Sequence, residues 1–388
     1  MKKWILIFIL PSFFILIQYV YLIRVFEIKK IEDIVNRQIA NRSIYGAAFN
    51  SNVFKYKLLL IEKNKPEIIA LGSSTVMTLE QKIFSKKFIN AGGAMNSLEE
   101  GILFIDELKK LTNRPKLLII NLDFWWFNIT YNKYNFKNFD YHTNKGNNLN
   151  LDTLYNFNKS LFSAQLPFET VKYFIQNKYM NNKYSNQDSL GLSALIKGTG
   201  YRHDGSYNYG GLLYGGEVSD DEQFLQTKNR INNENARFQT GEFLDEQQLK
   251  KLEILINKIE EMKIDYIFLI PPVANSVFTI IDKNPKYLFI EKIFQYLEIN
   301  YKEKFSNFFN PLNSTTYNCE FIDGFHAGAN TFAKIFNNMN NKSLKNFVLE
   351  KKELDLLITK NEGKAQFIIN EKQTLPEVDF LKLGCKKD

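Results

Sequence analysis

Short apolar runs alternate with helical patterns along most of the chain. Five apolar runs have the length and composition of strands buried on both faces of a sheet. They are Glu67–Leu71, Phe88–Asn90, Lys116–Leu122, Tyr266–Ile270 and Asn307–Phe309. Four other segments carry apolar residues at helical spacing. They are Ser97–Leu111, Asp245–Met262, Tyr287–Tyr301 and the segment after Gly328. This alternation predicts an α/β fold with a doubly wound, mainly parallel sheet and a site at the carboxyl ends of the strands.

The N-terminal segment has a different pattern. From Trp4 to Ile23 it contains about twenty residues without a charge, enough to cross the hydrocarbon core of a bilayer as a helix. Lys2 and Lys3 precede this run, which favours a cytoplasmic N-terminus and a periplasmic or extracellular body. No small-residue cleavage site follows it. We therefore expect an uncleaved N-terminal transmembrane helix over residues 1–27, in a single-pass protein of the cytoplasmic membrane. A buried core helix is the alternative.

The rest of the chain divides into three parts, the second of which contains an insertion. Residues 28–64 are mostly helical and amphipathic in pattern, and we expect them to form a stalk. Residues 65–350 form the body, and residues 351–388 a C-terminal tail. Within the body the alternation stops between residues 124 and 243, which indicates a long insertion over the site. A helix is expected in the insertion around Phe168–Tyr179.

Composition excludes some classes of function. The chain has 388 residues and a formal charge of +8, but no Arg-rich cluster interleaved with aromatic residues, so a nucleic-acid partner is not expected. His142 and His203 lie outside any spacing typical of metal ligands, and we expect neither a metal nor another cofactor. Cys319 and Cys385 are the only cysteines. An exported location would permit a disulfide between them, and two unpaired thiols are equally consistent with the sequence.

Three residues have the chemistry of a hydrolytic triad. Ser74 follows an apolar strand, and Asp323 and His326 lie together far along the chain. A serine hydroxyl is a weak nucleophile unless an imidazole takes its proton and a carboxylate fixes the tautomer of that imidazole. Each motif alone is weak, because serine after a strand also caps the start of a helix. Together, in this order and on an α/β background, they predict nucleophilic catalysis.

The same motifs resemble those of a known superfamily. Gly72-Ser73-Ser74, the segment Asn90–Asn96 and the Asp323-x-x-His326 pair are similar to blocks I, II and V of the GDSL/SGNH hydrolases. The N-terminal apolar run and the long insertion are most similar to membrane-anchored members, such as the D-alanyl transfer protein of teichoic acid modification and related O-acyltransferase partners. The resemblance covers the chain from Glu67 to Asn346 and implies a five-stranded, flavodoxin-like sheet of SGNH type.

The resemblance also implies roles for single residues. Ser74 matches the nucleophile, His326 the general base and Asp323 the carboxylate that orients it, while Ser73 matches the usual Asp position of the family. The oxyanion hole is expected to use the Ser74 and Met95 amides, with Asn121 or Asn96 as side-chain donors.

Two positions depart from the pattern of the family. Met95 stands where glycine is frequent, although its backbone N–H remains a donor. Asp123 falls in the segment where block III normally supplies an Asn donor, and a carboxyl group cannot donate unless it is protonated.

Residues after the strands are candidates for substrate binding. Ser73, Trp125, Trp126 and Pro272 follow strand ends and are expected to line the site; the two tryptophans and Pro272 could equally be core packing under the insertion. Arg202, in the insertion, lines an acceptor groove or lies in a surface loop stiffened by aromatic residues.

The function that these expectations support is acyl transfer on the cell envelope. An acetyl or D-alanyl group, supplied by a polytopic membrane O-acyltransferase, would pass through Ser74 to a sugar hydroxyl of an envelope polysaccharide. Water as the acceptor would make the protein an esterase instead. A catalytically inactive scaffold or binding partner of such a membrane acyltransferase is the alternative outside catalysis.

Overall fold

The fold comes from a computed structural model of the chain. It describes residues 2–49, 52–131, 151–163, 188–339, 341–367 and 375–387. The chain forms two compact units. The first unit contains Met1–Asn52, Asp140–His203 and Asn208–Gly211, and the second contains Val53–Phe139, Asp204–Tyr207 and Leu212–Asp388. The predicted helix around Phe168–Tyr179 lies outside the described residues.

A five-stranded parallel sheet is the centre of the second unit. Its strands stand in the order β3-β2-β4-β8-β9, and every neighbouring pair is parallel. They are β2 Ile68–Gly72, β3 Phe88–Gly92, β4 Leu117–Asn121, β8 Asp265–Ile270 and β9 Phe305–Asn307. All residues of β2, β3 and β4 are buried, as expected for parallel strands covered on both faces. The predicted α/β fold with a parallel sheet is confirmed.

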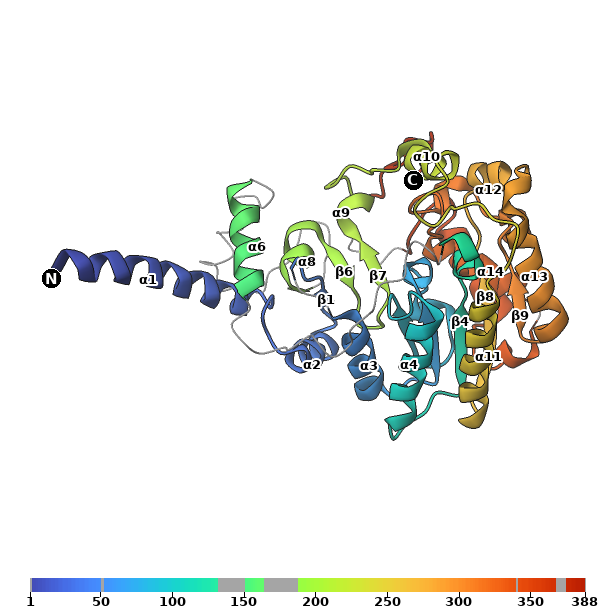
Figure 1. Ribbon diagram of the computed structural model, residues 1–388, viewed down its shortest axis with the longest axis horizontal. Helices are drawn as coiled ribbons and strands as arrows, with labels where there is room; N and C mark the ends of the chain where they lie inside the picture. The colour runs from blue at the N-terminus through green and yellow to red at the C-terminus, as the bar shows by residue number, and fades with distance from the viewer. Residues whose placement is uncertain are drawn as a thin grey trace. The chain divides into compact units, whose positions relative to one another are not determined.

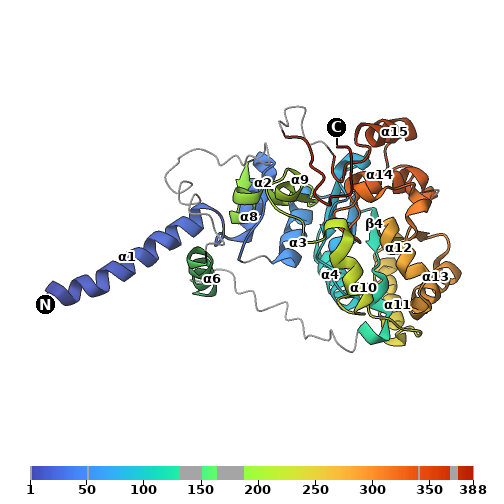
Figure 2. The same ribbon diagram turned by 90° about the horizontal axis from the view of Figure 1, so that it is seen from above.

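Helices cover both faces of this sheet. Helices α4 Leu98–Lys110 and α11 Glu246–Glu261 lie side by side on one face (Figure 1). Two ion pairs join them, Lys251 with Glu99 and Lys258 with Asp106. Helix α14 Ala329–Asn338 lies on the opposite face (Figure 2), where eight successive residues of it are buried.

Side-chain caps explain where two of the helices begin. Ser97 accepts a hydrogen bond from the Glu100 N–H at 3.3 Å at the start of α4, and Asp245 accepts one from the Gln247 N–H at 2.9 Å at the start of α11. The other elements of this unit are α3 Val53–Asn64, η1 Ser74–Val76, η2 Gln81–Ile83, η3 Phe124–Phe127, η5 Glu222–Phe224, α10 Leu225–Asn232, α12 Asn275–Asp282, η6 Pro285–Tyr287, α13 Leu288–Tyr301, η7 Pro311–Ser314, η8 Asn318–Glu320, η9 Lys342–Leu344 and α15 Lys351–Lys360.

The first unit joins the N-terminal segment to the insertion. Its elements are α1 Lys2–Arg24, α2 Ile31–Asn41, β1 Ile44–Tyr45, α6 Leu151–Phe162, β5 Ser189–Leu190, α8 Leu192–Lys197 and β6 Thr199–Tyr201. Strands β1, β5 and β6 form a small sheet with β7 Tyr207–Tyr209, in the order β5-β1-β6-β7. The short helix α9 Gly210–Leu213 follows β7.

A buried carboxylate holds the first unit together. Glu27 accepts hydrogen bonds from the backbone N–H groups of Ala48 at 2.9 Å, Phe49 at 3.3 Å and Leu192 at 2.6 Å. Burial raises the pKa of Glu27, against the lowering effect of these hydrogen bonds.

The residues of the predicted stalk, 28–64, belong to both units. Helix α2 and strand β1 lie in the first unit, and α3 lies in the second.

The predicted N-terminal transmembrane helix is wrong. Over the described part of the chain, no helix combines the length and the apolar character needed to cross a membrane. Helix α1 does form, but its last turn packs inside the first unit, where Tyr21 and Leu22 join a core cluster with Phe157 and Leu195. Apolar residues in this turn are thus buried by protein side chains, a use that the hydrophobic pattern cannot distinguish from burial in lipid.

Candidate active site

Ser74 lies just after the carboxyl end of β2, an interior strand of the sheet. The strand ends at Gly72, where an added Cβ would stand 2.7 Å from the Asn121 Cβ, so only glycine allows this close approach of β2 and β4. Ser73 then caps the 3-10 helix η1 and accepts from the Thr75 N–H at 3.3 Å. Ser74 is the first residue of η1 and is partly exposed, whereas Ser73 and Thr75 are buried. The turn therefore presents Ser74 at the edge of the sheet.

Three predicted residues meet at this edge. The Ser74 Oγ lies 2.8 Å from the His326 Nε2, and the His326 Nδ1 lies 2.6 Å from the Asp323 Oδ2. Asp323 also accepts from the backbone N–H groups of Phe325 at 2.9 Å and His326 at 2.8 Å through its Oδ1. With Nδ1–H donating to Asp323, Nε2 is free to accept the Ser74 proton, which is the arrangement of a serine hydrolase triad.

The environment of Asp323 favours its charged form. Burial acts to raise its pKa, but the neighbouring His326 ring and the hydrogen bonds from residues 325 and 326 outweigh burial and lower it. An ionised Asp323 accepts from Nδ1–H of His326 and so favours the tautomer in which Nε2 can accept the Ser74 proton.

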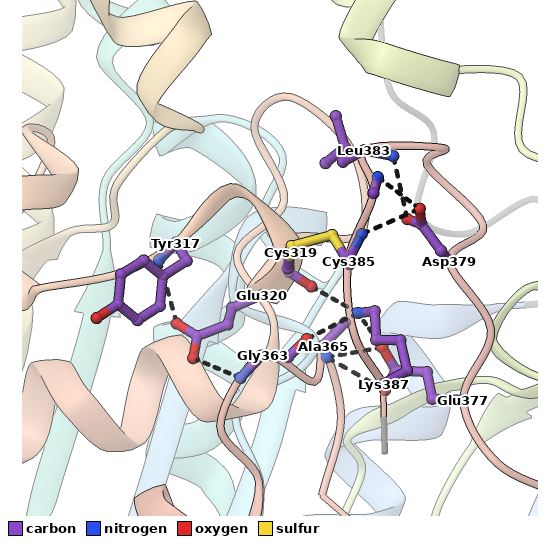
Figure 3. Close-up of a disulfide and its surroundings, with 11 residues drawn as sticks. Tyr317, Cys319, Glu320, Gly363, Ala365, Glu377, Asp379, Leu383, Cys385 and Lys387 are labelled. Atoms are coloured by element: carbon purple, nitrogen blue, oxygen red, sulfur yellow. Dashed lines mark hydrogen bonds and ion pairs between the residues drawn. A yellow bond between two sulfur atoms is a disulfide. The ribbon is translucent and has the colours of Figure 1, made fainter.

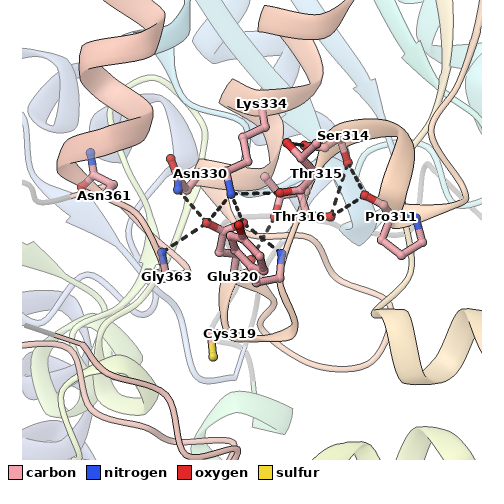
Figure 4. A network of polar contacts seen from close by, with 12 residues as sticks. Pro311, Ser314, Thr315, Thr316, Cys319, Glu320, Asn330, Lys334, Asn361 and Gly363 are labelled. Carbon is pink, nitrogen blue, oxygen red and sulfur yellow. Dashed lines mark hydrogen bonds and ion pairs between the residues drawn. The ribbon is translucent and has the colours of Figure 1, made fainter.

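A buried ion pair supports the loop that carries Asp323 and His326 (Figure 4). The fully buried Glu320 carboxylate accepts from Lys334 at 2.8 Å, Asn330 at 2.9 Å and the Gly363 N–H at 3.2 Å. Its backbone carbonyl accepts from the Gly328 N–H at 2.8 Å. Because these bonds hold both ends of the loop 320–328, they limit the positions available to the triad side chains between them.

A disulfide joins η8, just before this loop, to the C-terminal residues (Figure 3). Cys319 and Cys385 are bonded, with their Cα atoms 5.8 Å apart, which resolves the alternatives that the sequence leaves open. Beside it, the buried Lys387 donates to the Cys319 carbonyl at 2.8 Å and to Glu377 at 2.6 Å. The described part of the predicted C-terminal tail is therefore packed against the segment that leads to Asp323.

A buried polar network lies next to Ser74. The Thr75 hydroxyl donates to Asp123 Oδ1 at 2.7 Å and accepts from the Asn121 amide at 2.8 Å, and it lies 3.0 Å from the Ser73 hydroxyl. Asp123 is 2% exposed. Burial raises its pKa to about 6, although hydrogen bonds from Ser73 and Thr75 and the charges of Arg237 and His326 act in the opposite direction.

Most of the predicted oxyanion donors have other partners. The Met95 N–H donates to the Gly72 carbonyl at 3.2 Å, and the Asn121 amide is engaged by Thr75 and Asp123. Asn96 donates to Glu100 from its backbone at 2.6 Å and from its side chain at 2.9 Å. The Ser74 N–H is the member of the predicted set with no hydrogen bond to a described residue. The sequence shows which groups can donate, but their partners depend on the folded positions.

The predicted substrate-binding residues are distributed over both units. Trp125 and Trp126 lie in η3, directly after β4, and are 3% and 2% exposed. Pro272 is buried in the segment after β8, whose Ala274 N–H donates to the Gly324 carbonyl at 2.9 Å. Arg202 belongs to the first unit, where it is buried and donates to Asn208 at 2.8 Å. Substrate contacts by these residues remain predictions.

Two arginines near the triad are absent from the sequence-based set. The Arg237 guanidinium lies 5.5 Å from the centre of the Trp125 ring and 5.6 Å from that of Phe325, and the Arg230 guanidinium lies 5.9 Å from Phe325. The Phe325 ring is 4.2 Å from the His326 ring. Arg230 lies in α10 and Arg237 in the irregular segment after it, and a single arginine gives no sequence signal in either place, so only the fold identifies these two.

The described residues contain no group of three or more His, Cys, Asp or Glu side chains able to hold a metal ion. No model of a known protein family matches the chain. No curated protein matches it either. Any function must therefore be inferred from the positions and contacts of the site residues.

Proposed function

We propose that the protein is a serine acyltransferase or esterase that works through an acyl-enzyme on Ser74. The observation that carries this proposal is the 2.8 Å contact between Ser74 Oγ and His326 Nε2, with Asp323 at 2.6 Å behind the imidazole. The similarity of the three motifs to SGNH hydrolases supports the same reaction.

The reaction follows from the positions of these groups. His326 takes the Ser74 proton as the hydroxyl oxygen attacks an ester carbonyl, and the Ser74 N–H, which has no hydrogen bond to a described residue, is the donor left for the developing oxyanion. The tetrahedral intermediate then collapses, its C–O bond to the leaving alcohol breaks, and His326 donates its proton to that alcohol. A second hydroxyl, from a sugar or from water, repeats these steps in reverse and releases the acyl group from Ser74.

We propose an envelope polysaccharide as the acceptor, in an exported, oxidising compartment. The Cys319–Cys385 disulfide supports this location, because structural disulfides persist where thiols are not kept reduced. The acyl donor, acetyl or D-alanyl, would be supplied by a polytopic membrane O-acyltransferase. This assignment of donor and partner rests on the resemblance alone.

A catalytically inactive scaffold is the second candidate. It is favoured by the oxyanion region, where Met95, Asn96 and Asn121 are all engaged elsewhere and Asp123 accepts rather than donates. A triad with one oxyanion donor would retain its proton relay but lose stabilisation of the tetrahedral intermediate.

Mass spectrometry of the intact protein after exposure to an aryl acetate tests the proposal. An acyl-enzyme predicts a single acetyl adduct, located on Ser74 rather than Ser73 by fragmentation of the tryptic peptide, and no such adduct on the Ser74→Ala protein. Absence of both adduct and ester hydrolysis in a folded sample would favour the scaffold. Faster loss of the adduct with an oligosaccharide acceptor than with water alone would identify a transferase.

A further inference from the structure

Arg237 has a backbone conformation that L side chains rarely adopt. Its φ is +86°, and Glu234 and Ala236 just before it also have positive φ values of 51° and 47°. Such residues persist where the surrounding structure holds them, and they are concentrated at functional sites. The Arg237 N–H donates to the Gln239 side chain at 3.0 Å. The fold therefore maintains an unfavourable conformation at an arginine next to the triad.

The Arg237 guanidinium is held by aromatic rings rather than by an acid. It lies over both Trp125 and Phe325, whose ring centres are 6.1 Å apart at an interplanar angle of 89°. Among the described residues, no carboxylate forms an ion pair with it and no side chain accepts a hydrogen bond from it. Stacking leaves the N–H groups at the rim of the guanidinium plane available.

A second arginine lies on the same aromatic ring. Arg230 is over Phe325 and donates to Gln226 at 2.7 Å, and within the described ranges it also has no carboxylate partner. Both side chains are partly exposed. Two positive charges thus stand next to Phe325, which itself contacts the His326 ring. The charge of Arg237 acts on the buried Asp123, but no described carboxylate forms an ion pair with either arginine, so both partly exposed guanidinium groups can contact an added anion.

We propose that Arg237, assisted by Arg230, binds a carboxylate or phosphate group of the acyl acceptor beside Ser74. The planar guanidinium can contact two oxygens of either anion at once. The assignment of this anion to an acyl acceptor rests on the proposed acyl transfer, whereas the binding of an anion at Arg237 does not depend on that reaction. The substrate class is therefore an acidic polymer, with its charge in a uronic acid or in a phosphodiester.

Binding measured without catalysis tests this site. Full-length Ser74→Ala protein is titrated by calorimetry with oligoglucuronate, with oligo(glycerol phosphate) and with a neutral oligoglucose of matched length. We expect one of the acidic oligomers to bind, and the neutral one to bind at least about tenfold more weakly, because a charged hydrogen bond contributes roughly 1.5–3 kcal/mol. The acidic oligomer that binds more tightly identifies the source of the charge.

Variants in the Ser74→Ala background separate the site from general electrostatics. Arg237→Gln is expected to weaken binding of the acidic oligomer by about tenfold to a hundredfold, Arg237→Lys less, and Arg230→Gln by a smaller factor. Arg114→Gln removes the same charge at an exposed position before β4 and is the matched control. Thermal melts identify any variant that fails to fold, and Arg237→Lys then provides the comparison.

Three results would overturn the proposal: equal binding of neutral and acidic oligomers, no binding of any oligomer, or equal losses in Arg237→Gln and Arg114→Gln. Failure of acyl transfer gives a different result. If wild-type protein forms no acyl-enzyme but Arg237→Gln still weakens binding of an acidic oligomer, the proposed acyl transfer is wrong and the proposed anion site is supported.

Discussion

At the scale of single residues, the site depends on where each proton lies. Ser74, His326 and Asp323 form a chain of hydrogen bonds that ends on a carboxylate held in its charged form. Asp123, next to Ser74, has the opposite tendency, because burial raises its pKa by more than its hydrogen bonds and the charges of Arg237 and His326 lower it. The two aspartates therefore respond differently to pH and to substitution.

The triad makes a graded prediction. Ser74→Ala and His326→Ala are expected to lower kcat for an aryl ester by roughly a thousandfold or more. Asp323→Asn is expected to cause a loss about tenfold to a hundredfold smaller, because His326 is still present as a base but is no longer held in the required tautomer. Steady-state kinetics on folded variants checks this order. Residual activity in Ser74→Ala equal to wild type would mean that another group is the nucleophile.

Asp123 makes a prediction about stability and pH. Its pKa is raised from 3.8 to about 6 in the folded protein, so the folded state binds the proton more tightly and loses stability as pH rises between these values. The loss in the free energy of unfolding is complete above pH 6 and amounts to about 3 kcal/mol.

Asp123→Asn should therefore raise the melting temperature above pH 6, and the gain should vanish below about pH 4. Thermal melts across this range measure the difference. Asp282→Asn, at an exposed position, is the matched control. A gain that is the same at all pH values would show that Asp123 titrates normally.

At the scale of elements, the strands and helices follow their hydrophobic patterns closely. β2 and β4 lie within one residue of the predicted runs, because both are buried on two faces and are apolar up to their last residues, Gly72 and Asn121. β9 lies at Phe305–Asn307, two residues before the predicted position, since a three-residue edge strand carries too short a pattern to locate. β5, β6 and β7 in the insertion were not predicted for the same reason.

The loop between η8 and α14 makes an element-level prediction. Glu320→Gln should lower the free energy of unfolding by about 3–5 kcal/mol, because it leaves Lys334 charged and buried without its partner. Glu67→Gln, which breaks the exposed pair with Lys116, is the control and should cost less than about 1 kcal/mol. Denaturant unfolding compares the two. Similar losses in both variants would contradict the structural importance of the buried pair.

At the scale of the whole molecule, the second unit is closed by a covalent bond between distant segments. Cys319 and Cys385 are 66 residues apart, and the bond holds the described C-terminal residues against the loop that carries Asp323. Closure of a loop of this length restricts the unfolded chain and also supports the active-site geometry in the folded one.

Removal of the disulfide is therefore expected to affect stability and activity together. Cys319→Ser/Cys385→Ser should lose about 4 kcal/mol of stability by the chain-entropy argument and should lower kcat more than KM. Calorimetry and kinetics measure the two effects. Treatment with a thiol reductant should reproduce them in wild type and leave the double variant unchanged, and an unaltered kcat would show that the loop keeps its position without the bond.

The sequence by itself determined the α/β class, the main strands and helices, and the residue types able to form a triad, because these depend on local periodicity and side-chain chemistry. Tertiary structure decided the rest. It brought Ser74 to His326 across 252 residues, paired the two cysteines, engaged the predicted oxyanion donors and packed the end of α1 into protein. It also placed Arg237 beside the triad. Contacts between distant segments depend on how the whole chain packs, and no local pattern records them.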